Sequence, residues 1–107
     1  GLGDVYKRQE IFGPVVTLIP FENEEDAIQI ANESDYGLSA TIWTENEEKA
    51  NRVSNQVEAG VIWVNCWLVR DLRTPFGGMK QSGMGREGGS EALRFFTEQK
   101  NVCTSTG

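Results

Sequence analysis

A glycine-rich stretch, SGMGREGG, carries the spacing G-x-G-x-x-G through Gly83, Gly85 and Gly88. In a dinucleotide-binding loop, such glycines let backbone amides at a helix start hold a pyrophosphate. That loop also needs a strand directly before the first glycine and an acidic residue about 20 positions later. Here MKQS precedes Gly83 and no such acidic residue follows. We therefore expect the glycines to permit a tight turn or a close backbone approach, with a nucleotide site at GMGREG as the weaker alternative.

The other residue types limit the chemistry further. Histidine is absent, which excludes Ser-His-Asp and Cys-His catalysis and a His-ligated metal site within this sequence. The two cysteines, Cys66 and Cys103, lack C-x-x-C spacing, and we expect no disulfide. Cys66 is interpreted as a small buried hydrophobe, because no base is available to activate its thiol.

Composition indicates a soluble globular protein. The 107 residues are 38% hydrophobic and 24% charged, with 16 acidic against 10 basic side chains and a net charge of −6. This acidic balance argues against a nucleic-acid or anionic-membrane partner. No membrane span or signal-peptide pattern is present. We expect a cytoplasmic protein.

Apolar periodicity alternates between strand and helix. VVTLIPF (15–21) is strand-like. The next stretch, NEEDAIQIANES, predicts a helix capped by Asn23. A second strand is expected over 38–43, followed by a capping box of Thr44 and Glu47 that opens a second helix. The remaining predictions are a strand buried on both faces in GVIWVN (60–65), a helix around 92–96 and a polar, strand-like tail, NVCTST.

This alternation predicts an α/β fold, a mostly parallel sheet with right-handed crossover helices. Ligands of such sheets bind beyond the carboxyl ends of the strands. The segment from Asn65 to Phe76 begins at the carboxyl end of VIWV and is the best-placed candidate site.

Four ordered motifs then resemble one family. EIFGPV, YGLSATIWT, GVIWVN and PFGGMKQSGMGREGG occur in sequence and cover almost everything after Gln9. Together they resemble the carboxyl-terminal part of the aldehyde dehydrogenase superfamily. The stretch NCWLVRDLRTPFGGMK is most similar to the sequences of amino- or hydroxymuconic semialdehyde dehydrogenases.

The resemblance implies a cofactor contact near the amino end. The glutamate of the family's EIFGP motif binds the nicotinamide ribose hydroxyls, and Glu10 holds that position. Phe12 of the same motif would pack near the nicotinamide. The implied cofactor is NAD or NADP, with NAD favoured. Without the family, Glu10 would be interpreted as a solvated carboxylate at a strand start.

The resemblance also implies a substrate pocket. Phe76, the aromatic residue of PFGG, would line the aldehyde pocket, although it could equally anchor the glycine loop. Arg70 and, second, Arg73 would bind the carboxylate of a semialdehyde, because a guanidinium matches that group with two hydrogen bonds. Surface arginines paired with Asp71 are the alternative. Glu87, in the family's GRE, would serve as a proton relay or a structural prop.

The family's nucleophilic cysteine and general base lie upstream of the matching region. We therefore expect a piece of an NAD(P)-dependent aldehyde dehydrogenase that is inactive alone and comes from a homodimer or homotetramer. Residues 1–9 are interpreted as a non-native, adapter-like leader, or else a disordered or edge segment. Residues 10–100 would belong to the catalytic domain, and 101–107 would start an oligomerisation strand. The alternative is a non-catalytic α/β interaction module.

Overall fold

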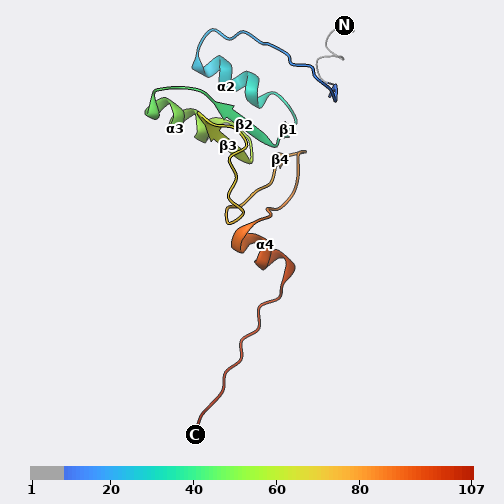
Figure 1. Ribbon diagram of the computed structural model, residues 1–107, viewed down its shortest axis with the longest axis vertical. Coiled ribbons are helices and arrows are strands. Elements are labelled where there is room, and N and C mark those ends of the chain that lie inside the picture. Colours follow the sequence, from blue (N-terminus) through green and yellow to red (C-terminus); the bar gives the residue numbers. More distant parts are fainter. Residues whose placement is uncertain (1–8) are drawn as a thin grey trace.

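A strand–helix–strand unit lies at the centre of the fold. In this computed structural model, which describes residues 9–107, strand β2 (Ser39–Ile42) leads through helix α3 (Glu47–Gln56) into strand β3 (Val61–Val64). β2 and β3 pair in parallel, with Ser39 opposite Val61 and Ile42 opposite Val64. α3 packs against β2 and against helix α2 (Glu24–Asn32) (Figure 1). The predicted α/β fold with a crossover helix is confirmed.

The two central helices begin at asparagine caps. The Asn23 side chain accepts a hydrogen bond from the Asp26 amide at 3.0 Å, as predicted for α2. The capping box predicted for α3 is wrong. Asn46 is the cap, accepting from the Lys49 amide at 2.8 Å, while the Thr44 hydroxyl accepts from the Asn46 amide. Asparagine is a slightly better cap than threonine, and Asn46 lies two residues nearer the helix than Thr44 does.

A second, smaller pairing brings the glycine-rich loop back to the central unit. Strand β1 (Tyr36–Gly37) pairs in antiparallel orientation with strand β4 (Met79–Lys80), with Tyr36 opposite Lys80. This pair could not be predicted from the sequence, because two-residue strands have no periodicity to detect.

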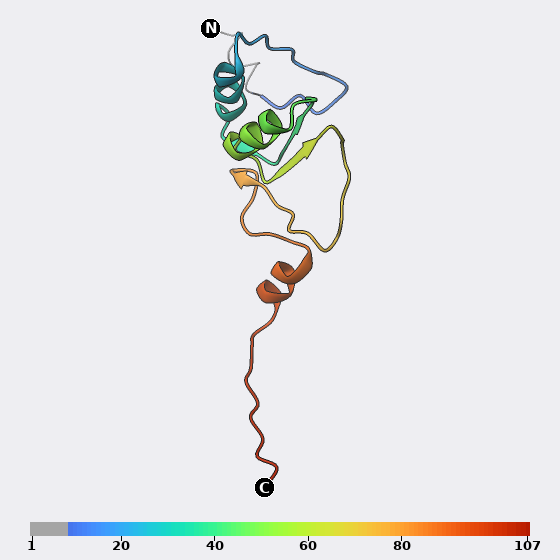
Figure 2. The same cartoon turned by 90° about the vertical axis from the view of Figure 1, so that its left-hand side faces the viewer.

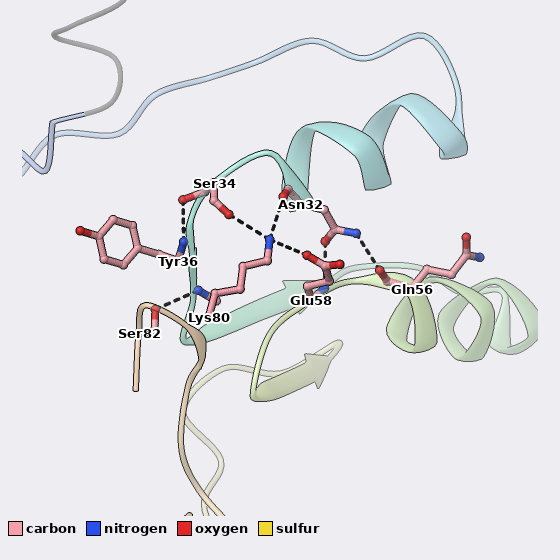
Figure 3. A network of polar contacts seen from close by, with 8 residues as sticks. Asn32, Ser34, Tyr36, Gln56, Glu58, Lys80 and Ser82 are labelled. Carbon is pink, nitrogen blue, oxygen red and sulfur yellow. Dashed lines mark hydrogen bonds and ion pairs between the residues drawn. The ribbon is translucent and has the colours of Figure 1, made fainter. Parts of the chain in front are cut away.

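Polar contacts hold this junction together. Lys80 Nζ donates to the carbonyls of Asn32 (2.8 Å) and Ser34 (2.9 Å) and pairs with the Glu58 carboxylate at 2.5 Å (Figure 3). The Asn32 side chain accepts from the Glu58 amide and donates to the Gln56 carbonyl, each at 2.8 Å. One lysine and one asparagine thus join the ends of α2 and α3 to β4.

The last part of the chain projects away from this centre. Helix α4 (Gly89–Phe96) and the extended residues 97–107 reach outward in both views (Figures 1 and 2). The radius of gyration is 19.3 Å, against about 13 Å for a compact domain of this length. No helix of the described residues is long and apolar enough to cross a membrane.

Apolar burial is correspondingly small. Within residues 9–107, Ala50 and Ala59 are the only buried apolar side chains. The strand predicted over 15–21 is wrong, because this stretch is extended but pairs with no other described strand. The strand-like tail is wrong for the same reason. β3 forms as predicted but is only half-buried, so burial on both faces is also wrong. Residues 1–8 of the predicted leader lie outside the described residues.

Replacing Lys80 by Met should loosen the junction between α2 and β4. The substitution leaves two carbonyls and the Glu58 carboxylate without a cationic partner, a loss of about 1.5–3 kcal/mol for hydrogen bonds to a charged group. We expect amide hydrogen exchange at Tyr36 and Gly37 to accelerate at least tenfold. Lys100→Met in the exposed tail is the control, and equal exchange in both variants would contradict the assignment.

The ion pair between α2 and α3 should depend on pH. Arg52 Nε lies 2.6 Å from Glu24 Oε1, and this hydrogen bond lowers the pKa of Glu24 from its ordinary 4.5. The pair therefore stabilises the folded chain above that pH and is lost as pH falls through the lower, folded value. We expect carboxyl-carbon NMR to give a Glu24 midpoint below 4.5 that rises in Arg52→Gln. A midpoint unchanged by the substitution would refute the coupling.

Candidate functional site

The candidate site starts where the parallel strands end. Asn65 follows β3 with a φ of +52°, in the left-handed region. Its side-chain oxygen accepts from the Thr44 amide and its side-chain nitrogen donates to the Thr44 carbonyl, both at 2.8 Å. Its own amide donates to the Ile42 carbonyl at 2.9 Å. Asn65 thus clamps the carboxyl ends of β2 and β3, and its role as a substrate contact stays a prediction.

The chain beyond Asn65 folds back on β3. The indole Nε1 of Trp63 donates to the Val69 carbonyl at 2.7 Å, across a loop in which Leu68 also has a positive φ of 55°. This hydrogen bond fixes the backbone one residue before Arg70. Trp63 was missed by the sequence analysis, which interpreted it only as a strand residue.

The glycine loop closes on this same segment. The Gly89 amide donates to the Leu72 carbonyl at 3.0 Å, and a side chain at Gly88 would collide with the Thr74 carbonyl. Gly88 also has a φ of +84°, which L side chains rarely adopt. The expected close backbone approach is therefore to residues 72–74. The Gly89 amide at the start of α4 is bonded within the protein, which argues against the phosphate-binding alternative.

Arg86 stabilises the loop from inside. Its Nη1 donates to the Gly78 carbonyl at 2.9 Å and to the Gly85 carbonyl at 2.7 Å. Because both acceptors are backbone groups, the guanidinium ties the two arms of the loop together. A side chain added at Gly85 would meet nothing within 4 Å, although the φ of this residue is +75°.

Three of the predicted site residues form one cluster. Arg70 Nη2 lies 2.7 Å from Glu87 Oε1, and the Arg70 Cζ atom lies 4.4 Å from the centre of the Phe76 ring. Phe76 and Glu87 also exchange backbone hydrogen bonds, both 2.7 Å long. The side chains of Arg70 and Glu87 remain 42% and 62% exposed. The cluster is thus an aromatic ring, a cation and an anion at an accessible surface.

Arg73 belongs to a different structure. Its guanidinium forms a two-pronged contact with Asp71, with Nη2 2.6 Å from Oδ2 and Nε 2.9 Å from Oδ1. This hydrogen bonding lowers the pKa of Asp71 and raises that of Arg73. The Asp71 carbonyl also accepts from the Thr74 hydroxyl at 2.7 Å. Arg73 therefore stabilises a local turn, as the alternative to substrate binding proposed, whereas Arg70 does not pair with Asp71.

The two residues predicted to contact a cofactor lie on the extended segment before α2. Glu10 is exposed, and the Phe12 side chain is 98% exposed. Their contacts with the ribose hydroxyls and with the nicotinamide ring stay predictions. Within the described residues, Cys66 is half-buried, Cys103 is exposed, and neither forms a disulfide.

Comparison with known proteins decides the family. The chain matches the aldehyde dehydrogenase family over residues 4–102. The chain belongs to the aldehyde dehydrogenase family. It is 60% identical to a 2-hydroxymuconic semialdehyde dehydrogenase of Pseudomonas sp. strain CF600 over 94% of this chain and 21% of the relative. It is 55% identical to a 2-aminomuconic semialdehyde dehydrogenase of Danio rerio over 89% of this chain and 20% of that relative.

Solved structures of related proteins have the same arrangement. An aldehyde dehydrogenase of Bacillus cereus in complex with NAD+ shares 46% identity with this chain at a TM-score of 0.83, over 94% of this chain and 20% of that one. HpcC of Thermus thermophilus shares 42% identity at a TM-score of 0.82, over 94% and 21%. The chain thus spans about a fifth of the length of the aldehyde dehydrogenases it matches.

Substitution of two glycines separates close packing from backbone conformation in this aldehyde dehydrogenase segment. Gly88→Ala would introduce both a collision with Thr74 and a strained φ, whereas Gly85→Ala adds strain without a collision. Strain alone costs about 1–3 kcal/mol, and the collision adds to it.

We expect Gly88→Ala to accelerate amide exchange at Phe76 and Glu87 at least tenfold more than Gly85→Ala does. Exchange that is equally fast in the two variants would mean that the loop does not depend on its approach to residues 72–74.

Proposed function

We propose that this chain forms part of an NAD(P)-dependent aldehyde dehydrogenase that oxidises an aldehyde bearing a carboxylate to the corresponding acid. The main support for the proposal is the position of Arg70. Its guanidinium packs on the Phe76 ring while its side chain stays 42% exposed. Relatives named as 2-hydroxymuconic and 2-aminomuconic semialdehyde dehydrogenases support this substrate class.

Arg70 has the donors that such a substrate needs. A guanidinium carries five N–H groups, and the contact with Glu87 uses Nη2. The four remaining N–H donors can bind a second carboxylate, with two parallel hydrogen bonds as the strongest arrangement. Phe76 covers one face of the guanidinium and would at the same time provide an apolar wall for the carbon chain of the aldehyde.

This chain would contribute binding and orientation in the proposed reaction. Arg70 would hold the carboxylate end of the substrate, so that the aldehyde end is presented to a nucleophilic thiol and a general base supplied from outside this chain. Glu10 would bind the ribose hydroxyls of the cofactor, and Phe12 would pack against its nicotinamide. NAD(P)+, when bound, accepts the hydride from the substrate. The NAD+ complex of the Bacillus cereus relative supports this cofactor class.

A chimera tests the proposal. This chain would replace the matching fifth of the Pseudomonas sp. strain CF600 relative. We expect NADH formation with 2-hydroxymuconic semialdehyde, and we expect Arg70→Gln to raise the KM for this substrate at least tenfold. Loss of a charge-assisted pair typically weakens binding by this much. The KM for hexanal, which has no carboxylate, should stay within twofold.

Arg73→Gln is the matched control, because Arg73 lies three residues away and pairs with Asp71 instead. Its KM values should resemble those of the unsubstituted chimera. An Arg73 effect larger than the Arg70 effect would transfer the proposed role to Arg73. An unsubstituted chimera without preference for the carboxylate-bearing aldehyde would refute the proposed substrate class.

A further inference from the structure

Glu87 and Phe76 hold the Arg70 guanidinium from two directions. The Phe76 ring lies with its centre 4.4 Å from Cζ and packs against the guanidinium. Glu87 Oε1 lies 2.7 Å from Nη2 and holds one end of the group. A flat, forked cation needs both restraints to present a fixed edge to a second carboxylate.

The two residues that contact Arg70 are also joined to each other through their backbones. Phe76 and Glu87 exchange hydrogen bonds through both their amides and both their carbonyls, each 2.7 Å long. Arg86, next to Glu87, also bonds to the Gly78 carbonyl, two residues after Phe76. The backbones of Phe76 and Glu87 are therefore held side by side, with the ring and the carboxylate both within reach of Arg70. The Trp63 indole fixes the carbonyl of Val69, directly before Arg70.

We propose that Glu87 is a positioning residue that orients Arg70 and thereby sets the preference for carboxylate-bearing aldehydes. This inference rests on the proposed function. The contact that the structure gives the Glu87 carboxylate is with Arg70 Nη2, which is the contact that a positioning role requires. A proton relay would instead make kcat and its pH profile depend on Glu87.

The exposure of the pair indicates which property Glu87 controls. Arg70 is 42% and Glu87 is 62% exposed, and ion pairs this exposed contribute little to folding. Holding a long side chain in its binding geometry beforehand, in contrast, strengthens binding by about three- to tenfold. Removing the charge of Glu87 should therefore weaken substrate binding and leave the stability of the fold unchanged.

The test uses the chimera described above with Glu87→Gln, which keeps the shape of the side chain and removes its charge. We expect the KM for 2-hydroxymuconic semialdehyde to rise three- to tenfold, with kcat, the pH profile of kcat, the hexanal KM and the melting temperature unchanged. Glu91→Gln is the matched control, because Glu91 lies four residues later and pairs with Arg94.

Two further variants sharpen the result. Glu87→Asp keeps the charge and should retain more of the substrate preference than Glu87→Gln. In an Arg70→Gln background, Glu87→Gln should add no further rise in KM, because the group that it orients is gone. An additive effect of the two substitutions would overturn the proposal.

Other outcomes also overturn it. A fall in kcat for both aldehydes with an altered pH profile would assign proton transfer to Glu87. A lower melting temperature with raised KM values for both aldehydes would assign Glu87 a purely structural role. An unchanged preference for the carboxylate-bearing aldehyde in Glu87→Gln would show that Glu87 has no role in it. If the proposed function itself is wrong, the unsubstituted chimera will already show no preference for the carboxylate-bearing aldehyde.

Discussion

The backbone of residues 72–76 and that of residues 87–89 lie close enough to share three hydrogen bonds, from Phe76 to Glu87, from Glu87 to Phe76 and from Gly89 to Leu72. Gly88 makes this approach possible, because a side chain there would occupy the position of the Thr74 carbonyl. The contact holds the loop that contains Arg70 and the loop that contains Glu87 side by side. The salt bridge between Arg70 and Glu87 depends on it, because the two residues lie on these two segments.

The parallel strands determine where this contact forms. β2 and β3 end at the same edge, and Asn65 joins their ends through the backbone of Thr44. The loop that follows carries its polar groups beyond the carboxyl ends of the strands, where α/β proteins bind ligands. Much apolar surface outside this region remains exposed, including Val16 (81%), Leu18 (86%) and Phe96 (78%). Exposed apolar surface of this kind is typical of proteins that contact further protein, as the proposal that the site is completed from outside this chain requires.

The sequence predicted the elements that have a strong local signal. The Asn23 cap, the apolar face of α3 around Ala50 and the run VIWV all indicated the observed α/β order. The run 15–21 has an equally strong strand signal but forms no strand, since strand formation requires a partner and local propensity cannot supply one. Sequence also indicated Arg70, Phe76 and Glu87 individually through the family resemblance. Their mutual contact depends on the approach of two distant backbones, and the clamp by Trp63 depends on a hydrogen bond to Val69 that no residue pattern reveals.

The most direct test of this account is a crystal structure of the chimera with the dicarboxylate product bound. We expect one product carboxylate to contact the Arg70 guanidinium on an edge not used by Glu87, while Glu87 and the Phe76 ring keep their contacts with Arg70. A product carboxylate bound to Arg73, or an Arg70 side chain turned away from both Phe76 and Glu87, would contradict it.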